Sequence, residues 1–147
     1  MKFKILIICI SIYSCNKHQT SINNKYIYYN KVSLEKVIEN PSQYDNKKIE
    51  IEGYYSYSME DSSISSKNKT PLENSIWVAF NFFKDMKNQK NNFLFKNDNL
   101  LNFKNKKVKI RGIFSSEYKG HMSWYKGSIK VEEFIYKNEK YVNTGNR

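Results

Sequence analysis

The 147-residue chain is long enough to form one domain around a hydrophobic core. Hydrophobic residues make up 39% of it and aromatic residues 16%, which excludes a wholly disordered chain. A single long apolar run excludes a protein with several membrane spans. The net charge of +11 comes from 25 basic residues, of which only 2 are arginine. An excess of lysine and asparagine is typical of AT-rich coding, so we interpret the charge as a solvated surface.

The first 15 residues have the pattern of an export signal. Lys2 and Lys4 precede an apolar run over residues 5–12, which is too short to span a bilayer as a helix. The run ends in Ile12-Tyr13-Ser14-Cys15, and the chain then turns polar. This resembles a bacterial lipoprotein signal, in which the cysteine is acylated and becomes the new N-terminus. The resemblance implies a signal peptide over 1–14, lipidation of Cys15 and a membrane-anchored place in the cell envelope; an ordinary secretory signal is the alternative.

Both cysteines are therefore expected to lie outside the folded domain, because Cys9 is removed with the signal and Cys15 carries lipid. The remainder divides into three parts. We expect a polar tether over 15–31 that ends in a pairing segment, a domain over 32–136, and a polar C-terminal tail over 137–147. With no disulfide available, the domain must be stabilised by packing alone.

The elements of the first half follow from capping residues and periodicity. Ser33 is a helix N-cap, and the spacing predicts a helix over 34–39 that ends at Asn40-Pro41. Alternating residues predict a strand over 49–57, interrupted by a glycine. Residues 59–75 read as a long hairpin connection with a weak strand around Ile64.

The second half contains two further strands and an ambiguous segment. Residues 76–83 are apolar on both faces, which predicts a central strand. Residues 84–99 form either a covering helix or a loop that buries the cluster at 93–95. Residues 127–136 read as a closing strand, and the phase of its alternation slips at Glu132-Glu133, which predicts a β-bulge.

Residues 44–56 and 103–115 carry the same pattern at a spacing of 59. In each copy, an aromatic residue, a turn and two lysines precede alternating β-branched residues and a glycine, Gly53 or Gly112. A glycine in mid-strand lets the strand bend at the corner of a barrel. Together with about five strands, this predicts a mainly β fold, a small OB-like five-stranded barrel with one or two short helices. A small antiparallel sandwich is the alternative.

Several short motifs occur in a fixed order between Val32 and Ile135. They are Asn40-Pro41, Ile49-Glu50-Ile51-Glu52-Gly53, Asn74-Ser75-Ile76-Trp77, Val108-Lys109-Ile110-Arg111-Gly112, Gly120-His121-Met122 and Gly127-Ser128-Ile129. In this order they resemble a family of uncharacterised bacterial proteins, of which the Gly-His-Met loop is the most specific mark. The resemblance implies an OB-like domain and no established activity.

Aromatic residues concentrate between the last two predicted strands, beside Gly120 and Gly127. A single histidine among them is either a ligand contact or a residue that holds its own loop in shape. We predict a ligand-binding loop over 118–126. The candidate ligand-binding residues are Tyr118, His121, Trp124, Tyr125 and Arg111.

Catalytic and metal-binding patterns are missing from the sequence. It has no thiol in the domain, no nucleophile or phosphate-loop motif, and His18 is the one histidine besides His121. We therefore expect neither catalysis nor a metal or cofactor. The predicted function is a lipid-anchored binding module for a protein, a peptide or an envelope glycan.

Two alternatives remain open at this point. One is an immunity-like inhibitor protein. The other is a single-stranded nucleic-acid-binding OB module, which would stack bases on aromatic side chains in a basic groove. Its surface would comprise Tyr54, Tyr57, Lys109, Arg111, Tyr118, Lys119 and Tyr125.

Overall fold

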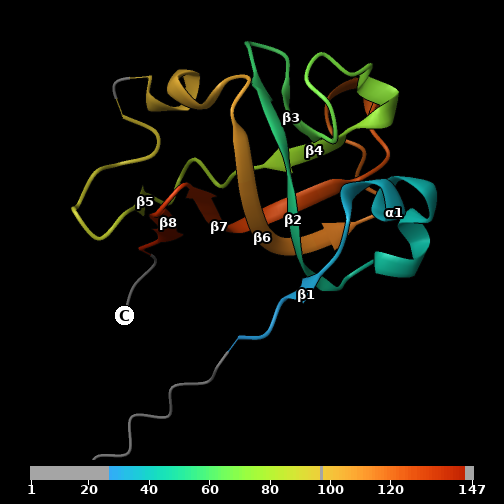
Figure 1. Ribbon diagram of the computed structural model, residues 1–147, viewed down its shortest axis with the longest axis horizontal. Helices are drawn as coiled ribbons and strands as arrows, with labels where there is room; N and C mark the ends of the chain where they lie inside the picture. Colours follow the sequence, from blue (N-terminus) through green and yellow to red (C-terminus); the bar gives the residue numbers. More distant parts are fainter. Residues whose placement is uncertain (1–26, 97, 145–147) are drawn as a thin grey trace, which may run out of the picture.

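The computed structural model describes residues 27–96 and 98–144 (Figure 1). The predicted signal peptide, Cys15 and most of the predicted tether lie outside these residues. The fold is mainly β, and no helix in the described ranges is long and apolar enough to cross a bilayer. The elements are β1 (Asn30–Lys31), α1 (Leu34–Glu39), β2 (Lys48–Tyr57), β3 (Ser62–Ser65), β4 (Ile76–Ala79), β5 (Met86–Lys87), β6 (Lys107–Ser115), β7 (Ser128–Tyr136) and β8 (Glu139–Asn143). Short 3-10 helices lie at η1 (Pro41–Tyr44), η2 (Leu72–Asn74), η3 (Asn99–Phe103) and η4 (His121–Ser123).

Five strands close into a barrel in the order β2-β3-β4-β7-β6 and back to β2. β4 and β7 run parallel, and every other neighbouring pair in the barrel is antiparallel. This closed mixed barrel with one short α-helix confirms the predicted OB-like fold. Because one sheet closes on itself, the alternative of two packed sheets is wrong.

The two copies of the predicted repeat pair with each other as β2 and β6, around a local two-fold axis. Ile51 lies opposite Ile110 at the centre of the pair, and Gly53 and Gly112 occupy equivalent places on either side. Asparagine, which tolerates the left-handed region, forms the turn before each strand. The two turns make the same hydrogen bond to the opposite strand: Asn46 N donates to Phe114 O at 2.9 Å, and Asn105 N donates to Tyr55 O at 2.8 Å.

Helix α1 closes one end of the barrel (Figure 1). Ser33 has extended backbone, and its hydroxyl accepts a hydrogen bond from Lys36 N, so the predicted cap and the predicted helix are confirmed. Leu34 and Val37 point inward and are buried, because they lie on one face of the helix. Pro41 begins η1, which leads directly into the turn before β2.

Aromatic side chains fill the opposite end of the barrel. They come from β2, β7, β8 and the long connection between β4 and β6, and they meet mostly edge-to-face or tilted, as aromatic rings prefer. Phe134 is fully buried at the centre of this aromatic plug. Its ring neighbours are Tyr55, Phe80, Phe103 and Tyr141.

The predicted central strand over 76–83 is too long. β4 ends at Ala79, and although it pairs on both sides, Phe82 and Phe83 are exposed to solvent. The cause is Asn81, whose side-chain oxygen accepts a hydrogen bond from Phe83 N and whose carbonyl accepts one from Lys84 N. An asparagine that bonds its own backbone two residues later starts a turn and stops the strand.

The predicted polar tail is also corrected, because residues 139–143 form strand β8. β8 pairs with β7 after a tight turn at Lys137-Asn138, and its Tyr141 is buried in the aromatic plug. Three other expectations hold. The weak strand around Ile64 is β3, the described part of 84–99 is a loop carrying the short strand β5, and the bulge at Glu132-Glu133 appears as a register shift between β6 and β7.

Candidate binding groove and the loops that border it

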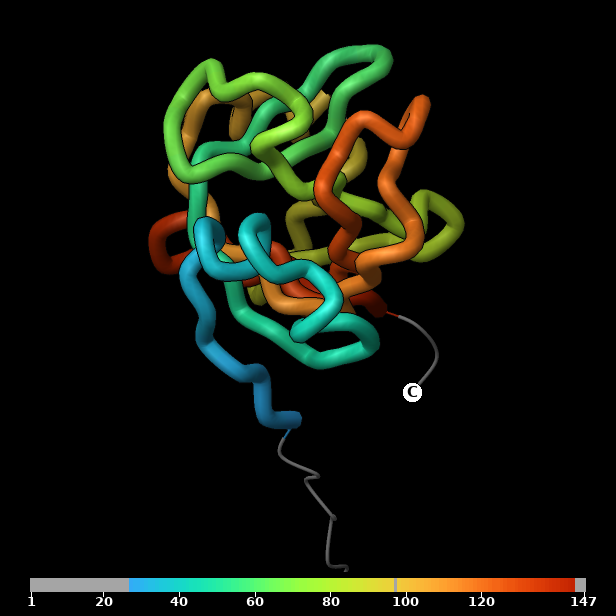
Figure 2. The backbone as a smooth tube through the Cα atoms, turned by 90° about the vertical axis from the view of Figure 1, so that its right-hand side faces the viewer, coloured from blue at the N-terminus to red at the C-terminus, as the bar shows by residue number. Residues whose placement is uncertain are grey.

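A groove of about 550 Å³ lies on the outer face of the barrel, over β4, β7 and β6. Lys130 sits in its floor, between Ala79 on one side and Ile113 on the other. Ser128 and Ser115, which pair with each other, form the next row of the floor. Most floor side chains are small, so space remains between the two loops that rise beside it. These loops, residues 80–83 and 116–127, project on the same side of the barrel, on the right in Figure 2.

The turn at 80–83 forms the first wall of the groove. Phe82 is 60% exposed, and Phe83 is fully exposed to solvent. The Phe82 ring packs against Phe95 at 5.0 Å and against Phe80 at 5.9 Å between centroids, so part of this ring is fixed while most of the side chain stays exposed. The turn therefore presents two aromatic rings to whatever occupies the groove.

The loop at 116–127 (the Gly-His-Met loop) forms the second wall. Its start is fixed by Asp45, whose Oδ1 accepts hydrogen bonds from Ser116 N at 2.7 Å and Ser116 Oγ at 2.9 Å. These hydrogen bonds lower the pKa of the Asp45 carboxyl below its ordinary value. The anchor brings Tyr118 to the groove, where its side chain lines the wall and is 56% exposed.

Gly120 sets the shape of the Gly-His-Met loop. Its φ of +70° and ψ of −158° belong to a region that essentially only glycine adopts, and a Cβ there would lie 2.5 Å from Cγ of Trp77. Two further residues of the loop, Met122 and Ser123, also have positive φ angles, of 53° and 58°. Strained backbone of this kind is held in place by its surroundings and clusters at functional sites.

Tyr125 is buried under the Gly-His-Met loop and does not contribute to the exposed surface of the loop. It is only 2% exposed, its ring packs on Trp77 at 5.2 Å, and its hydroxyl donates to Asp61 at 3.0 Å. Burial, and then the neighbouring Asp61 charge, raise the pKa of Tyr125, so the hydroxyl stays a donor. Tyr125, which the sequence predicts to be a ligand-binding residue, therefore stabilises the loop through its buried contacts.

His121 and Trp124 lie on the exposed side of the same loop. Their rings meet edge-to-face at 5.8 Å, and Trp124 keeps 45% of its surface exposed. Met122, which lies between them in sequence, is exposed as well. Of the predicted site residues on the exposed side of this loop, Tyr118 lines the groove, whereas His121 and Trp124 do not.

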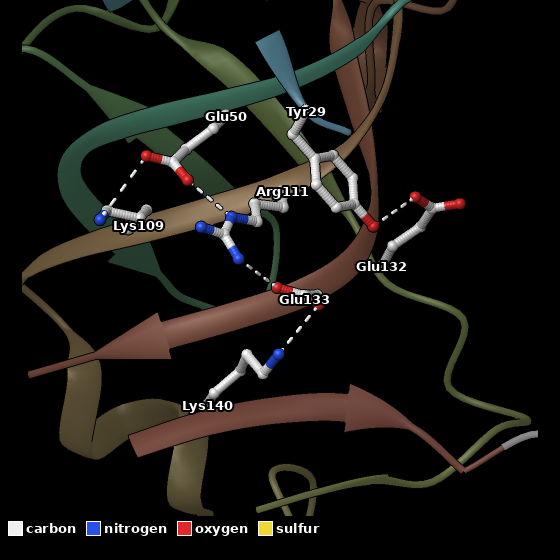
Figure 3. Close-up of polar contacts among 7 residues, drawn as sticks. All are labelled: Tyr29, Glu50, Lys109, Arg111, Glu132, Glu133 and Lys140. Carbon is white, nitrogen blue, oxygen red and sulfur yellow. Dashed lines mark hydrogen bonds and ion pairs between the residues drawn. The ribbon is translucent and has the colours of Figure 1, made fainter. Parts of the chain in front are cut away.

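Arg111 lies apart from the groove lining, within a network of charges on the outer face of β2, β6 and β7 (Figure 3). Its Nε donates to Glu50 at 2.6 Å and its Nη1 donates to Glu133 at 2.8 Å. Lys109 lies 3.6 Å from Glu50, and Lys140 lies 3.2 Å from Glu133. Because two of its donors already bind carboxylates, Arg111 serves to stabilise the sheet.

The same network clamps the end of the predicted tether onto the barrel. The Tyr29 hydroxyl donates to Glu132 at 2.8 Å (Figure 3), and Lys48 binds the same carboxylate at 2.8 Å. Arg111 and Lys48 also lie near the Tyr29 ring, at 5.7 and 5.6 Å from its centroid. Asn30 and the residue after it then pair with β2 as strand β1.

Removing Arg111 is expected to change how stability depends on pH. Burial alone would raise the pKa of Glu50, but the hydrogen bond and charge of Arg111, with help from Lys109, lower it below its ordinary value of 4.5. A lowered folded-state pKa contributes stability above the ordinary pKa, and this stability is lost as pH falls through the folded-state pKa. Arg111→Met should cost about 1–2 kcal/mol at pH 7 and less at pH 3.5.

Urea unfolding at both pH values measures this effect. Lys140→Met is the matched control, because Lys140 binds the same Glu133 from a more exposed position and should cost less at pH 7. A difference between wild type and Arg111→Met that stays constant with pH would contradict the assignment of Glu50.

Within residues 27–96 and 98–144, no group of three His, Cys, Asp or Glu side chains is placed to hold a metal ion. The expected nucleic-acid surface is not assembled either, because Tyr125 is buried and both Lys109 and Arg111 are bound to Glu50. The groove is instead lined by aromatic and small side chains with a few amides and hydroxyls. Such a site can bind a ligand by burial of apolar surface.

The sequence does not predict that Phe82, Phe83 and Lys130 line the groove. The apolar pattern predicts Phe82 and Phe83 to lie in a central strand, whereas the asparagine at position 81 is the local signal for the turn that contains them. Lys130 sits in a strand with ordinary alternation, and nothing in the sequence marks it. Its place in the groove follows only from the pairing of β4, β7 and β6.

Searches of protein-family models, curated proteins and solved structures gave no match for this chain. The groove and the Gly-His-Met loop both expose aromatic side chains, and the loop also has a backbone held in an unusual shape.

Proposed function

We propose that this chain is a lipid-anchored binding module of the bacterial cell envelope, which binds a protein, a peptide or an envelope glycan without catalysing a reaction. The observation that carries the proposal is the gathering of exposed large apolar side chains on the two loops that border one groove. These side chains are Phe82, Phe83, Tyr118, Met122 and Trp124. Apolar patches on soluble domains mark binding sites, because leaving them in water is unfavourable.

The anchor and the family are part of the same proposal. The charged start, the short apolar run and Cys15 support an acylated N-terminus, and the domain described begins shortly after it. The closed barrel and the shaped Gly-His-Met loop fit the family of uncharacterised bacterial OB-like proteins that the sequence resembles.

The anchor is tested by metabolic labelling with a palmitate analogue in a bacterial host. We expect the wild-type chain to incorporate the label and Cys15→Ala to lose it, because the acylated group is the cysteine itself. Cys9→Ala is the matched control and should label like the wild type. Equal labelling of wild type and Cys15→Ala would contradict the anchor.

Binding at the groove is tested by photo-crosslinking in intact cells. A photoreactive phenylalanine analogue at position 118 should yield discrete adducts, and the same analogue at exposed Leu101, on η3, serves as the control position. Combining it with Phe82→Ser and Phe83→Ser should reduce adducts at least about 10-fold, since central aromatic contacts often contribute 2 kcal/mol or more. Adducts that persist in this variant, or that are equal at position 101, would contradict binding at the groove.

The two alternative functions, an immunity-like inhibitor and a nucleic-acid-binding module, differ in how well they fit the groove. An immunity-like inhibitor is a special case of protein binding, in which the crosslinked partner would be an enzyme that the chain inhibits. Nucleic-acid binding gains less support, because Lys109 and Arg111, two of the cations that would contact a phosphate backbone, are already paired with Glu50.

A further inference from the structure

The outer face of the barrel pairs its charges with one exception. β2, β6 and β7 together carry nine charged side chains, and among the described residues eight of them are in ion pairs. The ninth is Lys130, for which the described residues provide no carboxylate partner. The nine are Lys48, Glu50, Glu52, Lys107, Lys109, Arg111, Lys130, Glu132 and Glu133.

The exception lies in the floor of the groove. The cross-strand neighbours of Lys130 are Ala79 and Ile113, and none of the described residues that line the groove is acidic. Elsewhere on the same strands a lysine has a glutamate across from it or nearby, as Lys107 has Glu52 at 3.0 Å. Among the described residues, Lys130 is thus the one charged side chain in a lining otherwise made of aromatic, aliphatic, amide and hydroxyl side chains.

A ligand that covers the groove would take water away from this ammonium group. Burying an unpaired charge is unfavourable by several kcal/mol, whereas a carboxylate in the ligand restores the lost interactions. Purely apolar ligands are therefore selected against at this site, and ligands with a negative group are favoured.

We propose that the occupant is an extended segment of a partner protein, in which an acidic residue adjoins one or more large apolar side chains. The carboxylate pairs with Lys130, and the apolar side chains pack between Phe83 and Tyr118. Asn46 and Asn81 also line the groove. A peptide backbone offers donors and acceptors to such polar groups, whereas an acyl chain would bury them without partners. This inference rests on the proposed binding function and names the chemistry of the partner.

The test uses a library of short random peptides displayed on phage and the full chain carrying Cys15→Ser. Peptides are selected on this chain and depleted on the same chain with Phe82→Ser and Phe83→Ser. We expect the enriched peptides to carry Asp or Glu next to an aromatic or aliphatic residue. One enriched peptide is then synthesised with its acidic residue and with the corresponding amide, and both are titrated by calorimetry.

The acidic peptide should bind about 10-fold more tightly than its amide counterpart, as expected for a charged hydrogen-bonded pair. Lys130→Gln should bind both peptides equally, and its thermal unfolding should match the wild type because the side chain is exposed. Lys137→Gln, at an exposed lysine in the turn after β7 and outside the groove lining, is the matched control and should keep the preference.

Groove-dependent peptides without acidic residues, or a preference that survives Lys130→Gln, would overturn the inference while leaving groove binding in place. Failure to enrich any groove-dependent peptide would also overturn it, and the in-cell crosslinking then decides whether the proposed function falls as well. Binding to phosphatidylglycerol vesicles through Phe82 and Phe83, with no peptide enriched, would show that the occupant is a lipid surface instead.

Discussion

Replacing Phe134 with alanine is expected to lower the free energy of unfolding by about 4 kcal/mol. The side chain is fully buried, and the rings of Tyr55, Phe80, Phe103 and Tyr141 surround it at 5.1–6.5 Å between centroids. Removing a buried phenylalanine loses its transfer free energy and leaves a cavity, which together cost about 3–5 kcal/mol. The rings around it come from several strands and a loop, so the end of the barrel cannot collapse onto the space easily.

Urea unfolding followed by far-UV circular dichroism measures this loss. Leu101→Ala is the control, because Leu101 is a large apolar residue on η3 that keeps 49% of its surface exposed, and it should cost less than about 1 kcal/mol. A similar cost for both variants would mean that the aromatic plug is not the centre of the core.

Gly112→Ala is expected to cost about 3 kcal/mol for a different reason. A Cβ at this position would lie 2.1 Å from the carbonyl oxygen of Lys130, so the backbone of β6 or β7 must move. The register of the two strands shifts beside Gly112, at the bulge, and the close approach of the strands there depends on a residue without a side chain.

The local two-fold axis supplies a matched variant for this experiment. Gly53→Ala would place a Cβ 2.5 Å from the carbonyl oxygen of Ser65, which is also backbone, so it should destabilise as well. The effect should be smaller, because this contact is longer than the 2.1 Å contact at Gly112. Lys107→Ala, on the same strand as Gly112 but exposed, should change the free energy of unfolding by no more than about 0.5 kcal/mol. A harmless Gly112→Ala would contradict the close packing at the bulge.

The elements whose sequence signals are local were predictable from the sequence. Ser33 and Pro41 delimit α1 through capping and sterics, and the repeated turn, alternation and glycine of residues 44–56 and 103–115 define β2 and β6. The phase slip at Glu132 likewise marks a bulge within one strand. At Asn81 a local turn signal competes with the apolar pattern of the strand, and the predicted strand boundary is wrong there.

The site was only partly predictable, because its geometry depends on contacts between distant parts of the chain. The aromatic composition of the loop predicts a binding site, but composition cannot distinguish exposed Trp124 from buried Tyr125. Tyr125 is buried because it packs on Trp77 and donates a hydrogen bond to Asp61. The role of Arg111 is likewise set by distant contacts. It binds Glu50 and Glu133 from two other strands, a pairing that the sequence alone does not reveal.

The pairing of the two repeats also dictates the order of events while the chain is being made. β2 cannot complete its pairing with β6 until a segment 59 positions further along has left the ribosome. At roughly 5–20 residues per second, that is a wait of roughly 3–12 s, during which one edge of β2 has no neighbour. Non-local strand pairing of this kind is slow, and α1 has only 6 residues, too few to be stable before it packs on the barrel. Until β6 arrives, the nascent protein exposes a β-edge with unpaired backbone groups, which can pair with another chain.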